Sequence, residues 1–312
     1  MVRLNMRRAE RVLVFADQPD WHVRSLVRAF RSAGAECAVA GLGAAGFAIG
    51  EDGRFDLPGV QGELPDLVFV KGIAAGSFEQ VTLRLGLLHA LGSVGVTTVN
   101  TARAIERCVD KSATSFVLAE AGVPTPPAWA SQSPEQAAAI LARETAAGHE
   151  LVLKPLFGAQ GRGLRRLRAG DSLPPPDGVQ GVYYLQRFVT VDGKGWRDWR
   201  VLVSGGRAVA AMIRHGSQWI TNVRQGARCE RVAAKGDLAD IAIAATRAVG
   251  AHYAGVDLIR DADGRWLVLE VNSMPAWKGL QGVTPFRIAP RLAADALGLL
   301  AAGRKRTRGR AA

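Results

Sequence analysis

The sequence predicts an α/β protein whose C-terminal part changes to α+β, built from more than one packed domain. Short apolar strands alternate with amphipathic helices over the first hundred residues, whereas successive strands dominate after residue 183. The 312 residues also exceed the roughly 250–300 residues at which a single core stops growing. With 48% apolar and 22% charged residues, the composition is that of a globular chain and excludes wholesale disorder.

The first domain is expected over 1–100. A buried strand over 11–16 leads into a helix over 20–33, which Gly34 ends. Further strands are expected over 36–40, 67–70 and 96–99, with a helix over 78–91.

The apolar runs of the whole sequence are too short to cross a bilayer. Its three widely spaced cysteines, without a CxxC pair, favour reduced thiols. We therefore expect a cytoplasmic protein without a membrane partner.

The second domain is expected over 101–182. A helix over 101–121 ends where Gly122 and several prolines break the chain. Ser133 is a suitable N-cap for an alanine-rich helix over 134–147, and the next strand carries Lys154 near its end.

The third domain is expected over 183–302 and consists mainly of antiparallel strands. Strands are predicted over 183–189, 198–206, 207–216, 218–223, 253–260 and 265–272, and helices over 238–249 and 288–300. The tail, 303–312, carries five of the positive charges behind the net charge of +12, and we expect it to lack fixed structure. A solubilising tail and a contact arm remain alternatives.

Two acids and an amide are predicted on one face of the last hairpin. The four-residue turn at 261–264 should place Asp257 opposite Val268 and diagonal to Glu270. Because side chains alternate along a strand, Asp257, Glu270 and Asn272 then share one face. The opposite face would be apolar and would hold Val256, Leu258, Leu267, Leu269 and Val271.

Two carboxylates on one sheet face repel each other unless a cation lies between them. Because all the ligand atoms would be oxygens, Mg²⁺ is the cation that suits such a site. A solvent-facing strand on which acids happen to align would give the same pattern, so spacing alone leaves both interpretations open.

A glycine-rich loop follows Lys154. Gly158, Gly161 and Gly163 would let backbone N–H groups approach phosphate oxygens, while the lysine supplies a positive charge. The loop lacks the GK[ST] ending of a P-loop, and a hairpin that only needs positive φ would look similar. A second glycine motif, GLGAAG at 41–46, fits GxGxxG but is followed by more glycines and a proline instead of a helix, which argues against a dinucleotide site.

Seven segments taken in order resemble the ATP-grasp superfamily, and specifically its RimK-type amino-acid ligases. They are DKSATSFVLAEAGVPTP, LVLKPLFGAQGRG, YLQRFV, RDWRVLVSGGRAVAAMIR, WITNVRQGA, GVDLI and LEVNSMP. The resemblance covers about residues 100–300 and implies an ATP-grasp fold behind a pre-ATP-grasp α/β domain. It departs from the family at Arg187, where protein-modifying members carry an acid, and at VRQGA, where RGG is more usual.

The resemblance also implies roles for individual residues. The lysines and loop that would contact ATP phosphates are Lys111, Lys154, Gly158, Gln160, Gly161 and Gly163. The hinge beside adenine would consist of Gln186, Arg187, Phe188 and Val189. Two Mg²⁺ ions, with Mn²⁺ as an alternative, would be held by Asp257, Glu270 and Asn272. Arg200 and Arg214 would act at the reaction centre, and Asn222 would contact substrate.

The implied reaction is amide formation through an acyl phosphate, driven by ATP. The segments KGWRDWR, WITN and EVNSMPAWKGLQ resemble ligases that add L-glutamate to tetrahydromethanopterin-type cofactors. The partners would be L-glutamate and an acceptor carboxylate, and relatives often form homo-oligomers. A protein C-terminus or an acidic carrier protein is the alternative acceptor. A basic nucleic-acid-binding protein is the alternative class, which 6% aromatic residues and the lack of a reading motif disfavour.

Overall fold

A computed structural model describes residues 8–50, 55–158, 161–191, 193 and 195–310. The chain forms two compact units, one from Met1–Arg103 together with Met274–Ala312, the other from Ala104–Ser273. This grouping differs from the expected boundaries, because the segment after Ser273 joins the first unit instead of a domain at 183–302.

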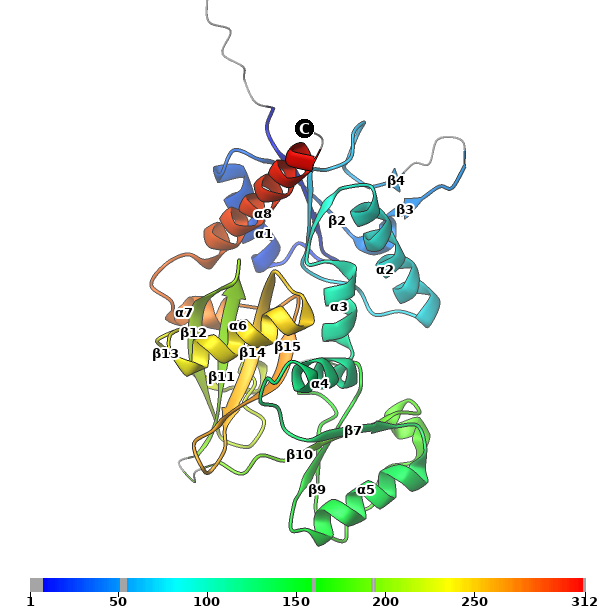
Figure 1. The fold of residues 1–312 in the computed structure, drawn as a ribbon, viewed down its shortest axis with the longest axis vertical. Helices are drawn as coiled ribbons and strands as arrows, with labels where there is room; N and C mark the ends of the chain where they lie inside the picture. Colours follow the sequence, from blue (N-terminus) through cyan, green and yellow to red (C-terminus); the bar gives the residue numbers. More distant parts are fainter. Residues whose placement is uncertain (1–7, 51–54, 159–160, 192, 194, 311–312) are drawn as a thin grey trace, which may run out of the picture. The chain divides into compact units, whose positions relative to one another are not determined.

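In the first unit, the strands expected from the sequence form a parallel sheet with the order β2-β1-β5-β6 (Figure 1). Its strands are β1 (Arg11–Phe15), β2 (Glu36–Ala40), β5 (Leu67–Val70) and β6 (Thr97–Val99). Its helices are α1 (Trp21–Ser32), α2 (Phe78–Ser93), α7 (Lys278–Val283) and α8 (Ile288–Arg310). The glycine motif at 41–46 leads into a 3₁₀ turn, η1 (Leu42–Ala44), and a two-stranded ribbon of β3 (Gly46–Phe47) and β4 (Phe55–Asp56).

Helix α8 corrects the prediction of an unstructured tail, because it continues to Arg310. Its first half packs against α1 and the sheet, and Ile288, Leu292 and Ala296 are buried there. Lysine and arginine have high helix propensity, and positive charge is favourable near a helix C-terminus, so the helix can propagate into the basic segment. Arg304 is paired with Glu10 and Asp66 of the same unit.

The second unit begins with a four-stranded antiparallel sheet, ordered β7-β10-β8-β9. Its strands are β7 (Ala128–Ser131), β8 (Leu151–Lys154), β9 (Arg165–Leu167) and β10 (Tyr183–Arg187), and α5 (Pro134–Ala146) packs on it. The single helix expected over 101–121 is two helices, α3 (Ala102–Val109) and α4 (Lys111–Glu120). Asp110 separates them because its carboxylate accepts from the amides of Ser112 and Ala113 and so caps α4. A 3₁₀ turn, η2 (Pro176–Val179), precedes β10.

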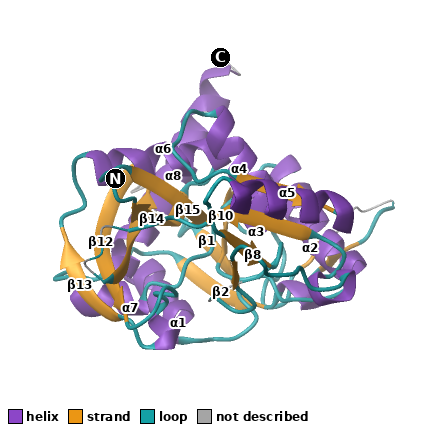
Figure 2. Cartoon of the chain, turned by 90° about the horizontal axis from the view of Figure 1, so that it is seen from below, coloured by secondary structure: helices purple, strands orange, loops and turns teal. Residues whose placement is uncertain are grey.

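A five-stranded antiparallel sheet completes the second unit, with the order β13-β12-β11-β14-β15. Its strands are β11 (Trp196–Ser204), β12 (Arg207–Gly216), β13 (Arg228–Val232), β14 (Tyr253–Arg260) and β15 (Trp266–Asn272). Helix α6 (Asp237–Val249) covers one face, as Figures 1 and 2 show, and its alanines pack on that face with Val256 and Val271. The opposite face is therefore left for the functional site.

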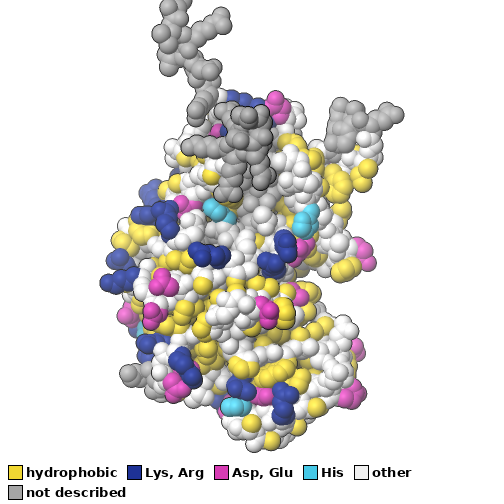
Figure 3. Space-filling view, in the orientation of Figure 1, with side chains coloured by type: hydrophobic (Ala, Val, Ile, Leu, Met, Phe, Trp, Pro, Cys, Tyr) yellow, Lys and Arg dark blue, Asp and Glu magenta, His cyan; other side chains and the backbone are white. Residues whose placement is uncertain are grey.

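The strand expected over 218–223 is not present. That segment is a loop that ends in the 3₁₀ turn η3 (Val223–Gln225), and β13, which was not predicted, pairs with β12 instead. Within the described residues, none of the helices combines the length and apolar character that crossing a membrane requires. On the face that Figure 3 shows, basic side chains are interspersed with acidic and apolar ones.

Candidate functional site

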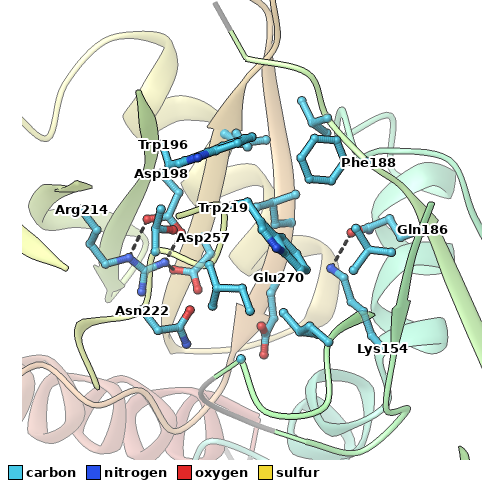
Figure 4. Close-up of a pocket in the computed structure, with 18 of the residues that line it drawn as sticks. Lys154, Gln186, Phe188, Trp196, Asp198, Arg214, Trp219, Asn222, Asp257 and Glu270 are labelled. Carbon is cyan, nitrogen blue, oxygen red and sulfur yellow. Dashed lines mark hydrogen bonds and ion pairs between the residues drawn. The ribbon is translucent and has the colours of Figure 1, made fainter. Parts of the chain in front are cut away.

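A pocket within the second unit brings together most of the predicted site residues. The four-stranded sheet contributes Lys154 and Gln186, and the five-stranded sheet contributes Arg214, Asp257 and Glu270 (Figure 4). The pocket is also lined by Lys111, Gly158, Gly161, Arg187, Phe188, Val189 and Asn222. Gly163, Arg200 and Asn272 do not line it, and Gln160 lies outside the described residues.

The carboxylate hairpin has a different register from the predicted one. Asp257 pairs directly with Glu270, whereas Leu258 pairs with Val268, so Leu269 is an extra residue in β15. This β-bulge turns Val268 into the core and lets Leu269 line the pocket, the reverse of the prediction. Its consequence is that the two carboxylates lie opposite each other on neighbouring strands instead of on a diagonal.

The Asp257 carboxylate forms ion pairs with two arginines. Arg200, its partner in the β11–β14 register, donates from Nη2 to Oδ2 at 2.7 Å and from Nε to Oδ1. Arg214 approaches the same Oδ1 with Nη2 at 3.1 Å. Burial alone would raise the pKa of Asp257, but the two guanidiniums outweigh it and hold the pKa below its ordinary value. Asp257 is therefore ionised, with arginine donors on both carboxylate oxygens.

Arg214 links this pair to a second acid, Asp198. Its Nε donates to Asp198 Oδ1 at 2.7 Å, and its Nη2 donates to the other carboxylate oxygen. Asp198 is 6% exposed and Arg214 is 4% exposed, so the pair is buried. Burial raises the pKa of Asp198 despite its arginine partner. No function was predicted for Asp198, and only the strand pairing shows that it holds Arg214.

The lysines on the other side of the pocket have neutral partners. Lys154 donates from Nζ to Gln186 Oε1 at 2.6 Å, and Lys111 donates to the carbonyl oxygen of Gly158 at 2.9 Å. Neither lysine forms an ion pair with a carboxylate in the part of the chain that the structure describes. Burial lowers the pKa of Lys154 to about 8, although Glu270 acts in the opposite direction. These ammonium groups keep charge and donors available for an anion.

The glycine loop lies against the loop that follows β12. Gly161 has a φ of +68°, and a Cβ at this position would lie 2.8 Å from Ile220 Cγ2 and 3.5 Å from Asn222 Cγ. The lack of a side chain is therefore required here, both for the backbone conformation and for the close approach. Asn222, predicted to contact substrate, is thus a neighbour of the predicted phosphate loop.

Two aromatic residues for which no role was predicted, Trp196 and Trp219, line the pocket beside Phe188 of the predicted hinge. The Phe188 ring lies 6.1 Å from the Trp196 ring and 5.9 Å from the Trp219 ring, in edge-to-face geometry. The guanidinium of Arg166 lies 3.8 Å from the centre of the Phe188 ring. Sequence spacing gave no sign of this cluster because its members come from three separate segments.

Glu270 is available for a cation. Within the described residues its carboxylate makes no hydrogen bond or ion pair, and in Figure 4 it lies between the arginine–aspartate cluster and Lys154. The described chain offers no cluster of three or more acidic, histidine or cysteine ligands. Mg²⁺ is commonly bound through one or two carboxylates, with phosphate and water oxygens completing the shell. Asp257 and Glu270 fit that pattern, provided that a phosphate-bearing ligand shares the site.

The chain is similar in sequence to a family of ATP-grasp proteins and to named ligases. A family model described as RimK-like ATP-grasp domain matches residues 108–295. The chain is 33% identical over 235 residues to the tetrahydromethanopterin:alpha-L-glutamate ligase of Methanococcus maripaludis, and the aligned region covers 73% of this chain and 78% of that protein. It is 31% identical over 248 residues to the enzyme of that name from Methanosarcina acetivorans, covering 69% and 74%.

Solved structures give the same picture at the level of the fold. The ATP-grasp ligase PsnB complexed with minimal precursor has a TM-score of 0.71 at 23% identity, covering 93% of this chain and 99% of that chain. The structure of PsnB complexed with minimal precursor, Mg and ADP has a TM-score of 0.68 at 23% identity, covering 93% and 98%.

Proposed function

Since the chain belongs to the RimK-like ATP-grasp family, we propose that it adds L-glutamate to a tetrahydromethanopterin-type cofactor. The family and the ATP-grasp fold, both expected from the sequence, are confirmed. The protein is thus an ATP-dependent, amide-forming ligase, and we propose Mg²⁺ as its metal. The identity of the acceptor and the roles of individual residues belong to the proposal.

The binding of ATP and a metal is supported by the charges that face the pocket. Lys111 and Lys154 face a pocket in which Glu270 has no partner among the described residues. A polyanion with a bound divalent cation would therefore balance the charges of the lysines and of this carboxylate. The glycine loop would fold over the phosphates, and the segment 186–189 would border the adenine. Asp257 and Glu270, with Asn272 at the end of the hairpin, would hold the metal. Two ions are proposed, with Mn²⁺ as an alternative.

The reaction is proposed to occur in two steps. The acceptor carboxylate attacks the γ-phosphorus of ATP, giving an acyl phosphate and ADP, and the amino group of glutamate then displaces phosphate to form the amide. Bound Mg²⁺ would neutralise charge on the triphosphate. Lys154 and Lys111 would orient the phosphates, and Arg214, fixed by Asp198, would stabilise the phosphoryl group during transfer. The mechanism requires no covalent protein nucleophile.

The substrate assignment is supported by the two relatives, both named tetrahydromethanopterin:alpha-L-glutamate ligase. A flat heteroaromatic acceptor also suits a pocket that contains Phe188, Trp196 and Trp219, because such rings offer stacking and edge contacts. Self-association, expected from the sequence, stays a prediction.

The test is a phosphate-release assay with ATP, Mg²⁺, L-glutamate and a panel of acceptors. We expect release that depends on both glutamate and a tetrahydromethanopterin-type acceptor, with a product heavier by one glutamyl group. Glu270→Gln should abolish release over a full Mg²⁺ titration, whereas Glu120→Gln, an exposed acid at the end of α4, should not change it.

Other outcomes would redirect the proposal. Glutamate-dependent release with a protein C-terminus or an acidic carrier protein, and none with the pterin, would replace the acceptor and leave the ligase chemistry in place. Unchanged release by Glu270→Gln would remove this residue from the metal site. Steeply salt-dependent RNA binding without ATP turnover would contradict the whole proposal.

A further inference from the structure

A groove along helix α1 in the first unit is positively charged and has no acidic lining. It consists of two cavities of about 400 and 640 Å³ that share Arg28 and Ser32. We call it the basic groove, and its four arginines are Arg24, Arg28, Arg31 and Arg287. It belongs to a different unit from the pocket described above, so the ligase reaction leaves it unexplained.

The four arginines have no acidic partners within the described residues. Arg24 donates to the carbonyl oxygen of Pro19, and Arg31 donates to that of Cys37 at 3.0 Å, so both side chains are held beside the groove by neutral groups. Arg28 and Arg287 are exposed. Because a guanidinium has five N–H donors, each arginine keeps donors that can bind a carboxylate or a phosphate.

Helix α8 adds to the positive character of the groove. Arg287 immediately precedes α8, and Ala289 and Pro290 of its first turn line the cavity. The N-terminal end of a long helix carries partial positive charge. Gln281 accepts from the Ile288 amide at 2.9 Å and holds this end of the helix in place. Two arginine side chains and a helix N-terminus therefore converge on the same cavity.

The spacing of the arginines suits an extended chain of alternating acids. Arg24, Arg28 and Arg31 lie on successive turns of α1, about 6.0 and about 4.5 Å apart along its axis. In an extended peptide, alternate side chains point the same way and repeat about every 6.6 Å. Three carboxylates at alternate positions can thus each meet one arginine in turn. Arg287 and the polar side chains of Ser25 and Ser32 extend the groove beyond them.

A single-stranded nucleic acid matches the lining less well. Such ligands need exposed aromatic faces on which bases can stack. Among the residues that line the two cavities, Trp21 alone is aromatic, and it is half-buried with its ring edge-to-face against His22 at 5.1 Å. We therefore propose that the basic groove binds an extended acidic segment of a partner polypeptide. This proposal is independent of the acceptor used by the ligase site.

The test is fluorescence anisotropy of a labelled oligoglutamate peptide against the full-length protein, with a titration of salt. We expect saturable binding that weakens as salt increases. The double variant Arg28→Glu with Arg287→Glu should weaken binding about tenfold or more, because each reversal replaces an attraction with a repulsion. Arg231→Glu, an exposed arginine of β13 in the second unit, is the matched control and should change binding less than about twofold.

ATP-dependent phosphate release should be unchanged in all of these variants, which shows that they are folded. The proposal is overturned if the peptide does not bind saturably, or if Arg231→Glu weakens it as much as the double variant does. It is also overturned if an oligouridylate of equal charge binds more tightly and loses binding in the same double variant, because the groove would then select nucleic acid.

Discussion

The two sides of the pocket in the second unit handle charge in opposite ways. On the five-stranded sheet, the arginines are neutralised within the protein, since Arg200 and Arg214 are both paired with Asp257. On the four-stranded sheet, Lys154 donates to the amide oxygen of Gln186, and none of the residues that the structure describes gives it a counter-ion. The arginine–aspartate network of the five-stranded sheet is thus complete within the protein, although Glu270 of that sheet is not part of it, whereas the lysine side is incomplete without an anion.

Because of this difference, substitutions on the two sides should differ in their effect on the stability of the fold. A buried ion pair that loses one member leaves the other charge uncompensated, which costs more than the pair contributed. A buried ammonium without a counter-ion is already unfavourable in the free protein, and only a ligand can offset that cost. Substitutions on the two sides should therefore affect folding differently even where they affect catalysis alike.

The largest effect is expected for Asp257→Ala. This change removes the acidic partner of Arg200, whose side chain is 12% exposed, and one of the two acidic partners of Arg214. We expect destabilisation of about 3–5 kcal/mol, measured by urea unfolding. We also expect a loss of phosphate release of about 10³-fold, since a proposed metal ligand and the orientation of Arg214 are lost together. A variant that kept wild-type stability would show that the network is dispensable for the fold.

A smaller effect, confined to activity, is expected for Lys154→Met. Methionine fills a similar volume without the charge, so the main losses are the contact with phosphate and the hydrogen bond to Gln186. We expect phosphate release to fall about 10²–10³-fold, with destabilisation of no more than about 1–2 kcal/mol because a desolvated charge is removed at the same time. Destabilisation equal to that of Asp257→Ala would contradict the comparison between the two sides.

The sequence predicted the incomplete side better than the complete one. Lys154 at the end of a buried strand and the glycines after it form a local pattern, which could be recognised without knowing the fold. The network depends on strand pairing across β11, β12 and β14, and no local pattern shows that Asp198 holds Arg214. The lysine and the glycines can thus be recognised within one segment, whereas the network joins residues of three strands.

The errors have local causes that a single sequence does not reveal. The hairpin register shifted because β15 holds an extra residue at Leu269, and turn length alone cannot predict a bulge. The expected helix over 101–121 divides at Asp110, a residue whose capping tendency competes with a continuous helical pattern. Apolar residues in 218–223 resembled a strand, although they line the pocket as a loop beside Gly161.

The pH dependence of catalysis should show the smallest but most specific effect. Burial lowers the pKa of Lys154 to about 8, so this group loses its proton in the free enzyme within an accessible range. If protonated Lys154 binds the phosphates, kcat/KM for ATP should be constant below that pKa and fall about tenfold per pH unit above it. Bound ATP should raise the pKa of the lysine, so kcat at saturating ATP should decline only at higher pH.

The Lys154→Met variant is the control, because it should lose the alkaline decline in kcat/KM. A decline that persisted in that variant would assign the titration to another group, and the incomplete charge of this side of the pocket would then have no measurable role in binding.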